Sequence, residues 1–107
     1  MNIKEIPDKA YIPLGRRGME AFNLRECLKC GNENEEELEL LDKQDVTEKE
    51  GDNLLNIKTY KVKCNKCGAT YKIIVKSLYA KEQTEENRLV SAVHYTENGE
   101  EQWLGVF

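Results

Sequence analysis

All four cysteines of this 107-residue chain fall in two copies of one pattern, Cys-x-x-Cys-Gly, at residues 27–31 and 64–68. In a tight turn, two cysteines separated by two residues direct both sulfurs toward one point. The glycine that follows can adopt positive φ, which lets backbone N–H groups turn inward and donate to the sulfurs. The repeated pattern therefore predicts one site that takes two sulfur ligands from each half of the chain.

Four thiolates at about 2.3 Å from one ion make the shell of a structural zinc site. The predicted ligands are Cys27, Cys30, Cys64 and Cys67. Two alternatives stay open: two disulfides, or a dithiol redox site, although the latter normally accompanies a β-α-β pattern that is absent here. The N-terminus lacks the apolar run of a signal peptide, so we expect a cytoplasmic chain, in which thiols stay reduced and one structural zinc is favoured.

The two knuckles resemble those of the zinc-ribbon family, in which Cys-x-x-Cys-Gly knuckles flank β-hairpins. The resemblance covers about residues 25–76 and implies a small antiparallel sheet held by a zinc ion on the same four cysteines. The interval between Cys30 and Cys64 is 33 residues, longer than the roughly 15–20 residues of the simple pattern. The interval therefore leaves the ribbon subtype undefined.

Alternating apolar and polar residues predict a mainly β fold, a zinc-ribbon-like antiparallel meander with few helices. Residues 78–88 are ambiguous between a helix and a hairpin loop, with strands that end near Ala80 and restart at Leu89. We expect strands at residues 38–46, 54–64 and 70–76. We expect a single domain, 1–107, made of an N-terminal arm (1–26), a zinc-ribbon-like core (27–76), and a linker with a C-terminal hairpin (77–107).

Both ends of the chain carry local signals. The arm contains both prolines and many apolar residues, so we expect an extended segment that packs on the rest, with at most a helical turn or two at residues 19–25. At the other end, Asn98-Gly99 between alternating runs is typical of a tight hairpin turn, because both central residues need positive φ. The predicted cross-strand pairs are Tyr95 with Gln102, His94 with Trp103, Val93 with Leu104, and Ser91 with Val106.

Charge is unevenly distributed along the chain, whose net charge is −4. Residues 33–52 carry ten acids against two lysines, whereas residues 58–76 carry six lysines and no acid. Such asymmetry indicates either two strands that neutralise each other or two surfaces for different partners.

Nothing in the sequence indicates catalysis. Four cysteines close the coordination shell of a zinc ion, so no position remains for water or substrate. The sequence has no glycine-rich phosphate loop and no G-x-S-x-G motif, and its only histidine, His94, is expected to be a packing or surface residue. We therefore expect a binding protein and not an enzyme.

A protein partner is the first hypothesis, because an acidic strand can dock on a basic groove. The candidate contacts are Glu35, Glu36, Glu37, Glu39, Asp42 and Trp103. In size, in Lys/Glu/Asn-rich composition and in its four clamped cysteines, the chain is also similar to small zinc-bearing anti-CRISPR proteins of phages. That resemblance implies an inhibitor in the host-cell cytoplasm that occupies an RNA-guided type II nuclease and prevents its target DNA from entering.

Nucleic acid is the alternative partner. Many zinc ribbons act as nucleic-acid-binding or transcription-associated modules, and lysines interleaved with tyrosines suit that role. The candidate lysines are Lys58, Lys61, Lys63, Lys72 and Lys76. The same lysines also fit a solvated face that neighbouring glutamates neutralise, and the overall acidity opposes strong phosphate affinity. No stretch has the roughly 18 apolar residues of a membrane span, so no membrane partner is expected.

Overall fold

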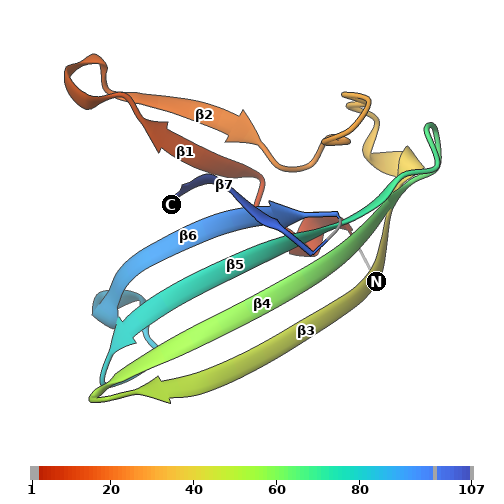
Figure 1. Cartoon of the computed structure of the whole chain (residues 1–107). Coiled ribbons are helices and arrows are strands. Elements are labelled where there is room, and N and C mark those ends of the chain that lie inside the picture. The colour runs from red at the N-terminus through yellow and green to blue at the C-terminus, as the bar shows by residue number, and fades with distance from the viewer. Residues whose placement is uncertain (1–2, 98, 107) are drawn as a thin grey trace.

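The computed structural model describes residues 3–97 and 99–106. Within these residues, seven strands form one antiparallel sheet in the order β2-β1-β7-β6-β5-β4-β3 (Figure 1). The strands are β1 (Lys9–Pro13), β2 (Met19–Asn23), β3 (Leu38–Glu50), β4 (Asn53–Cys64), β5 (Thr70–Ala80), β6 (Arg88–Thr96) and β7 (Glu101–Val106). The short 3₁₀ turns are η1 (Ile3–Glu5), η2 (Gly15–Arg17), η3 (Glu35–Glu37) and η4 (Glu85–Asn87). The prediction of a mainly β, antiparallel fold with few helices is confirmed.

Strands β3 to β6 form a meander in which each strand pairs with the next. The predicted strands are present and longer than expected, and β3 joins β4 through an exposed turn at Gly51 and Asp52. The ambiguous segment is a hairpin: β5 continues to Ala80, and β6 begins at Arg88. Leu78 pairs with Val90 across the two strands. The helix-forming glutamates of this segment therefore lie in the loop that connects β5 to β6.

The sheet has an inner face that carries the core. Along β4 and β5, the alternating side chains of Tyr60, Val62, Tyr71 and Ile73 are at most 3% exposed. Residues of opposite parity, such as Ile57, lie on the other face, which we call the outer face. Strand β4 therefore carries apolar side chains on both faces and pairs with β5 without a bulge. The register shift lies in β3, between Leu40 and Asp42.

The N-terminal arm differs from its prediction in one respect. The arm is extended, as expected, and the helical turn allowed for at residues 19–25 is absent from this described segment, because Met19–Asn23 forms β2 and pairs with β1. Gly15 and Gly18 have φ of 66° and 89°, and they close a turn in which Leu14 N donates to Gly18 O at 2.8 Å. The expectation that the arm packs on the rest is confirmed. Its apolar side chains Ile3, Ile6, Ala10 and Leu24 are buried in one cluster with the inner face.

The C-terminal hairpin follows its predicted register near the turn and departs from it further out. Asn98 lies outside the described residues, and the pairs Tyr95–Gln102 and His94–Trp103 are confirmed. The pairs Val93–Leu104 and Ser91–Val106 are wrong. A bulge shifts the register after His94, so that Val93 faces Gly105 and Ala92 faces Val106.

The bulge brings Gly105 against β1. Gly105 has φ of 150°, and a Cβ at this position would lie 2.8 Å from Tyr11 O and 3.1 Å from Ala10 Cβ. Strand β1 is attached to β7 through the pair Tyr11–Val106. A glycine is thus required where the arm joins the sheet.

We expect Gly105→Ala to destabilise the fold by about 1–3 kcal/mol, because the added methyl meets backbone atoms that cannot rotate away. Urea denaturation followed by circular dichroism measures this change. Gln102→Ala, an exposed change in the same strand, serves as the control and is expected to stay within about 0.5 kcal/mol of the parent chain. Equal stability of the two variants would show that β1 does not pack tightly on β7.

Candidate metal centre

The two cysteine knuckles have the same backbone geometry. Cys27 N donates to Asn32 O and Cys64 N donates to Ala69 O, both at 2.9 Å. In each knuckle the glycine N–H returns to the carbonyl of the first cysteine, at 2.9 Å for Gly31 and 2.8 Å for Gly68. Both glycines have φ of 77°. The positive φ predicted after each cysteine pair is confirmed, and it produces two equivalent turns.

The knuckles bring all four sulfurs together. The Sγ atoms of Cys27, Cys30, Cys64 and Cys67 lie within 4.8 Å of one another. The distance is 3.6 Å from Cys27 Sγ to Cys67 Sγ and 3.8 Å from Cys30 Sγ to Cys64 Sγ. Tetrahedral zinc with bonds of about 2.3 Å separates its sulfurs by about 3.8 Å. All four thiols are free, and the four cysteines are positioned to bind one metal ion.

The pKa values of two of these thiols shift in opposite directions. Hydrogen bonds lower the pKa of Cys64, and the neighbouring sulfurs help to raise the pKa of Cys30. Burial raises the pKa of Cys64, but N–H donors from Cys67 and Lys66 outweigh it and lower that pKa to about 6. At Cys30 a hydrogen bond from Asn32 lowers the pKa, yet desolvation and the neighbouring sulfurs raise it to about 12. A metal-free cluster would therefore retain protons at neutral pH, and a divalent cation is the species that stabilises all four thiolates together.

Asn32 links the two halves of the site and was missed by the sequence analysis. This side chain is 8% exposed, and its Nδ2 donates to Cys64 Sγ at 3.9 Å. Its Oδ1 accepts from Asn34 N at 3.1 Å, which fixes the orientation of the amide. No local pattern marked it, since the second knuckle has Ala69 at the equivalent position. Asn32 thus acts as a support behind the ligands, of the kind that orients metal-binding groups.

A second support ties the first knuckle to the C-terminal hairpin. Lys29 Nζ lies 2.7 Å from Glu97 Oε2, and Tyr95 OH donates to the same carboxylate oxygen at 2.7 Å. The hydrogen bonds from Lys29 and Tyr95 lower the pKa of Glu97, and burial together with Glu97 raises the pKa of Tyr95 to about 12. Lys29 lies inside the first Cys-x-x-Cys motif, but Glu97 is far from it in the sequence, so the pair could not be predicted locally.

Comparisons with protein families, curated proteins and solved structures found no match for the chain. The metal site therefore rests on the geometry described above. Among the residues that the structure describes, no helix has the length and apolar character needed to cross a membrane.

The acidic residues predicted as partner contacts lie at one edge of the sheet. Glu39 and Asp42 lie on the outer face of β3, the edge strand, and η3 precedes it. Trp103 is 47% exposed on β7 and shares the outer face, but three strands separate it from β3. The structure therefore groups Glu35, Glu36, Glu37, Glu39 and Asp42, and leaves Trp103 apart from them.

The predicted lysines divide between the two faces. Lys58 lies on the inner face, in register with Val75, whereas the others lie on the outer face: Lys61, Lys63, Lys72 and Lys76. The acidic strand is indeed the neighbour of the basic one, with Glu39 facing Lys63 and Asp42 facing Lys61. None of these facing pairs forms an ion pair within the described part of the chain.

Proposed function

We propose that this chain is a non-enzymatic, zinc-stabilised binding protein that docks on a protein partner through the outer face of its sheet. The observation that supports this proposal is a set of apolar side chains on that face, which we call the apolar band: Val46, Leu55, Ile57, Leu78, Val90 and Trp103. Val46 is 49% exposed, and Val90 and Trp103 are each 47% exposed. Exposed apolar surface spread over several strands is typical of an interaction site.

The metal supports the sheet and takes no part in chemistry in this proposal. A zinc ion with four cysteine ligands has no open position for water or substrate. Its ligands come from residues on either side of β3 and β4, so the ion holds the base of this hairpin in place. A rigid platform lowers the entropic cost of binding, which suits a protein that acts by occupying a surface.

For the partner, we propose a nucleic-acid-handling protein, and specifically an RNA-guided type II nuclease that this chain prevents from taking up target DNA. The acidic edge supports this choice, because Glu39 and Asp42 lie on the same outer face as the apolar band and are free of ion pairs within the described residues. A basic groove that normally holds nucleic acid is complementary to such an edge. The small size and the Lys/Glu-rich composition also agree with an anti-CRISPR type of inhibitor.

The test is inhibition of DNA cleavage by a type II nuclease as the concentration of this chain rises. We expect stoichiometric inhibition by the parent chain, and a loss of about tenfold or more in potency for Glu39→Lys/Asp42→Lys, because two attractive charges become repulsive. Glu82→Lys/Glu86→Lys carries the same charge change in the exposed loop between β5 and β6 and is the matched control. Equal potency of the two variants would remove the acidic edge from the mechanism, and no inhibition by the parent chain would remove this partner.

Nucleic acid as the partner is the competing outcome. The structure leaves Lys61, Lys63 and Lys72 together on the outer face, while Lys76 is held by Glu101 at 2.9 Å and Lys58 faces inward. A gel shift with random DNA and RNA at low and moderate salt separates the two classes. A complex that weakens steeply with salt would replace the protein partner by nucleic acid.

A further inference from the structure

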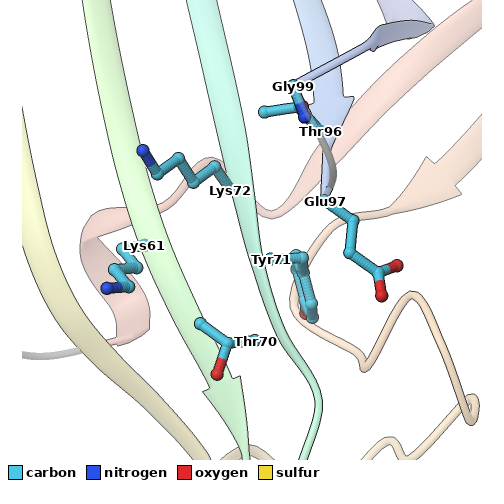
Figure 2. A pocket seen from close by; sticks show the side chains of 7 residues that line it. All are labelled: Lys61, Thr70, Tyr71, Lys72, Thr96, Glu97 and Gly99. Atoms are coloured by element: carbon cyan, nitrogen blue, oxygen red, sulfur yellow. The ribbon is translucent and has the colours of Figure 1, made fainter.

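A hollow of about 320 Å³ lies where β4 and β5 meet the turn between β6 and β7. Figure 2 shows its lining, to which seven residues contribute: Lys61, Thr70, Tyr71, Lys72, Thr96, Glu97 and Gly99. This volume falls in the range of roughly 300–1,000 Å³ that is typical of small-molecule sites. The lining includes two lysine ammonium groups and two threonine hydroxyls, together with the Glu97 carboxylate and the Tyr71 side chain, so its chemistry differs from that of the apolar band.

Two lysines face each other in this hollow without a counterion. Lys61 and Lys72 are register partners on neighbouring strands, and Figure 2 shows both side chains extending to the same side of the sheet. Neither forms an ion pair within the described residues. Like charges directly opposite each other in a sheet are destabilising, and a bound anion would relieve this repulsion.

The neighbouring carboxylates are not paired with these lysines. Asp42 is the register partner of Lys61 on β3, yet the two form no ion pair within the described residues. Glu97 is bound by Lys29 and Tyr95, and in Figure 2 its carboxylate points away from the two lysines. Glu101 is held by Lys76 at 2.9 Å. Glu97 lines the hollow, but its carboxylate is engaged by Lys29 and Tyr95, and neither Glu97 nor Glu101 forms an ion pair with Lys61 or Lys72 within the described residues.

Hydroxyl donors complete the lining. Thr70 lies two residues before Lys72 in β5 and shares its face. Thr96 is 8% exposed, and its Oγ1 accepts from Gly99 N at 3.2 Å, which leaves the hydroxyl proton available to donate. Ammonium and hydroxyl donors gathered in one concave place are the groups that recognise a phosphate.

We propose that this hollow binds a single phosphate group. Of the five lysines that the sequence suggested for nucleic acid, Lys61, Lys63 and Lys72 share the outer face without an ion pair in the described part of the chain, which suits one phosphate better than a groove that follows a nucleic-acid backbone. The phosphate can belong to a small molecule or to the end of a nucleic-acid strand, since both present the same oxygen acceptors. The site is independent of the docking proposal, because phosphate binding requires no protein partner.

The test is a titration of the zinc-loaded, ¹⁵N-labelled protein with inorganic phosphate at constant ionic strength. We expect saturable shifts of the amides of Lys61, Thr70, Lys72 and Gly99. Lys61→Gln/Lys72→Gln is expected to raise the apparent Kd about tenfold or more, because charge-assisted hydrogen bonds to the anion are lost. Lys9→Gln/Lys49→Gln removes the same charge from exposed positions on β1 and β3 and is the matched control.

The outcomes separate clearly. Saturable binding that the control retains and the double variant loses supports the site. Absence of saturable shifts in the parent chain, or equal weakening in both variants, overturns it. If Lys61→Gln/Lys72→Gln fails to fold, as judged by its zinc content and amide spectrum, Lys72→Gln alone provides the same comparison.

Two further arms identify the source of the phosphate. A mononucleotide that binds more tightly than inorganic phosphate indicates a small molecule. A 5′-phosphorylated oligonucleotide that binds more tightly than its unphosphorylated counterpart indicates a strand end. Identical binding of both oligonucleotides, without saturable inorganic phosphate binding, would contradict a site for a single phosphate group.

Discussion

Removal of the metal is expected to unfold the chain. A structural zinc site contributes about 10–16 kcal/mol of apparent binding free energy at neutral pH, which is as large as the whole stability of a typical domain, about 5–15 kcal/mol. The four sulfurs belong to residues 27–30 and 64–67, on either side of β3 and β4. Without the ion, the loss of this clamp would open the base of that hairpin.

The measurement combines metal analysis with circular dichroism. Freshly purified protein should contain one zinc ion per chain, and a strong chelator should abolish the sheet signal, with recovery when zinc is restored. Cys64→Ser, which replaces a buried ligand, should give the same loss without chelator. Ser91→Ala, a small buried change away from the site, is the control that should keep its metal. An unchanged sheet signal after complete removal of the metal would disprove the structural role.

Ile6→Ala is expected to cost about 2–5 kcal/mol, as large-to-small changes at fully buried positions do. Ile6 is 0% exposed and belongs to the cluster on the inner face of the sheet. The backbone carbonyl of Ile6 accepts a hydrogen bond from Arg25 Nε at 3.0 Å. This bond joins the beginning of the arm to its end. The truncation would leave a cavity under the arm and weaken its attachment.

Urea denaturation of the zinc-loaded protein measures this cost. Leu14→Ala is the matched control in the same arm, because Leu14 is 43% exposed and a change there should stay within about 0.5 kcal/mol. Equal stability of the two variants would mean that the arm adds nothing to the core.

The strands of the meander were predictable because each carries a local alternation that matches its burial. Tyr71, Ile73 and Val75 repeat every second residue, and all three are buried. Strand β2 was not predictable in this way. Its sequence, MEAFN, has the composition of a helical turn, and only the pairing with β1 makes it extended. The shifted register of β7 likewise depends on a contact between Gly105 and Tyr11, which are far apart in the chain.

The same distinction holds for the metal centre. The four ligands follow from a local motif, whose cysteine spacing and glycine encode the turn. Asn32 and the pair of Lys29 with Glu97 depend on how the knuckles meet the rest of the fold, so no local pattern reveals them. Successive side chains of a strand point to opposite faces of the sheet. Once the register of β4 is known, this alternation tells which lysines lie on the inner face and which on the outer face.

The metal site lies at one end of the β3–β4 hairpin. In Figure 1 the segments that precede β3 and follow β4 lie at one end of these two long strands, and the turn between β3 and β4 lies at the other. Each doubling of a flexible loop costs only about 0.6 kcal/mol, and exposed loop tips tolerate insertions. A fluorescent reporter or an epitope tag inserted between Gly51 and Asp52 would thus sit far from the sulfurs, and would give a handle for tracking the protein while leaving its metal in place.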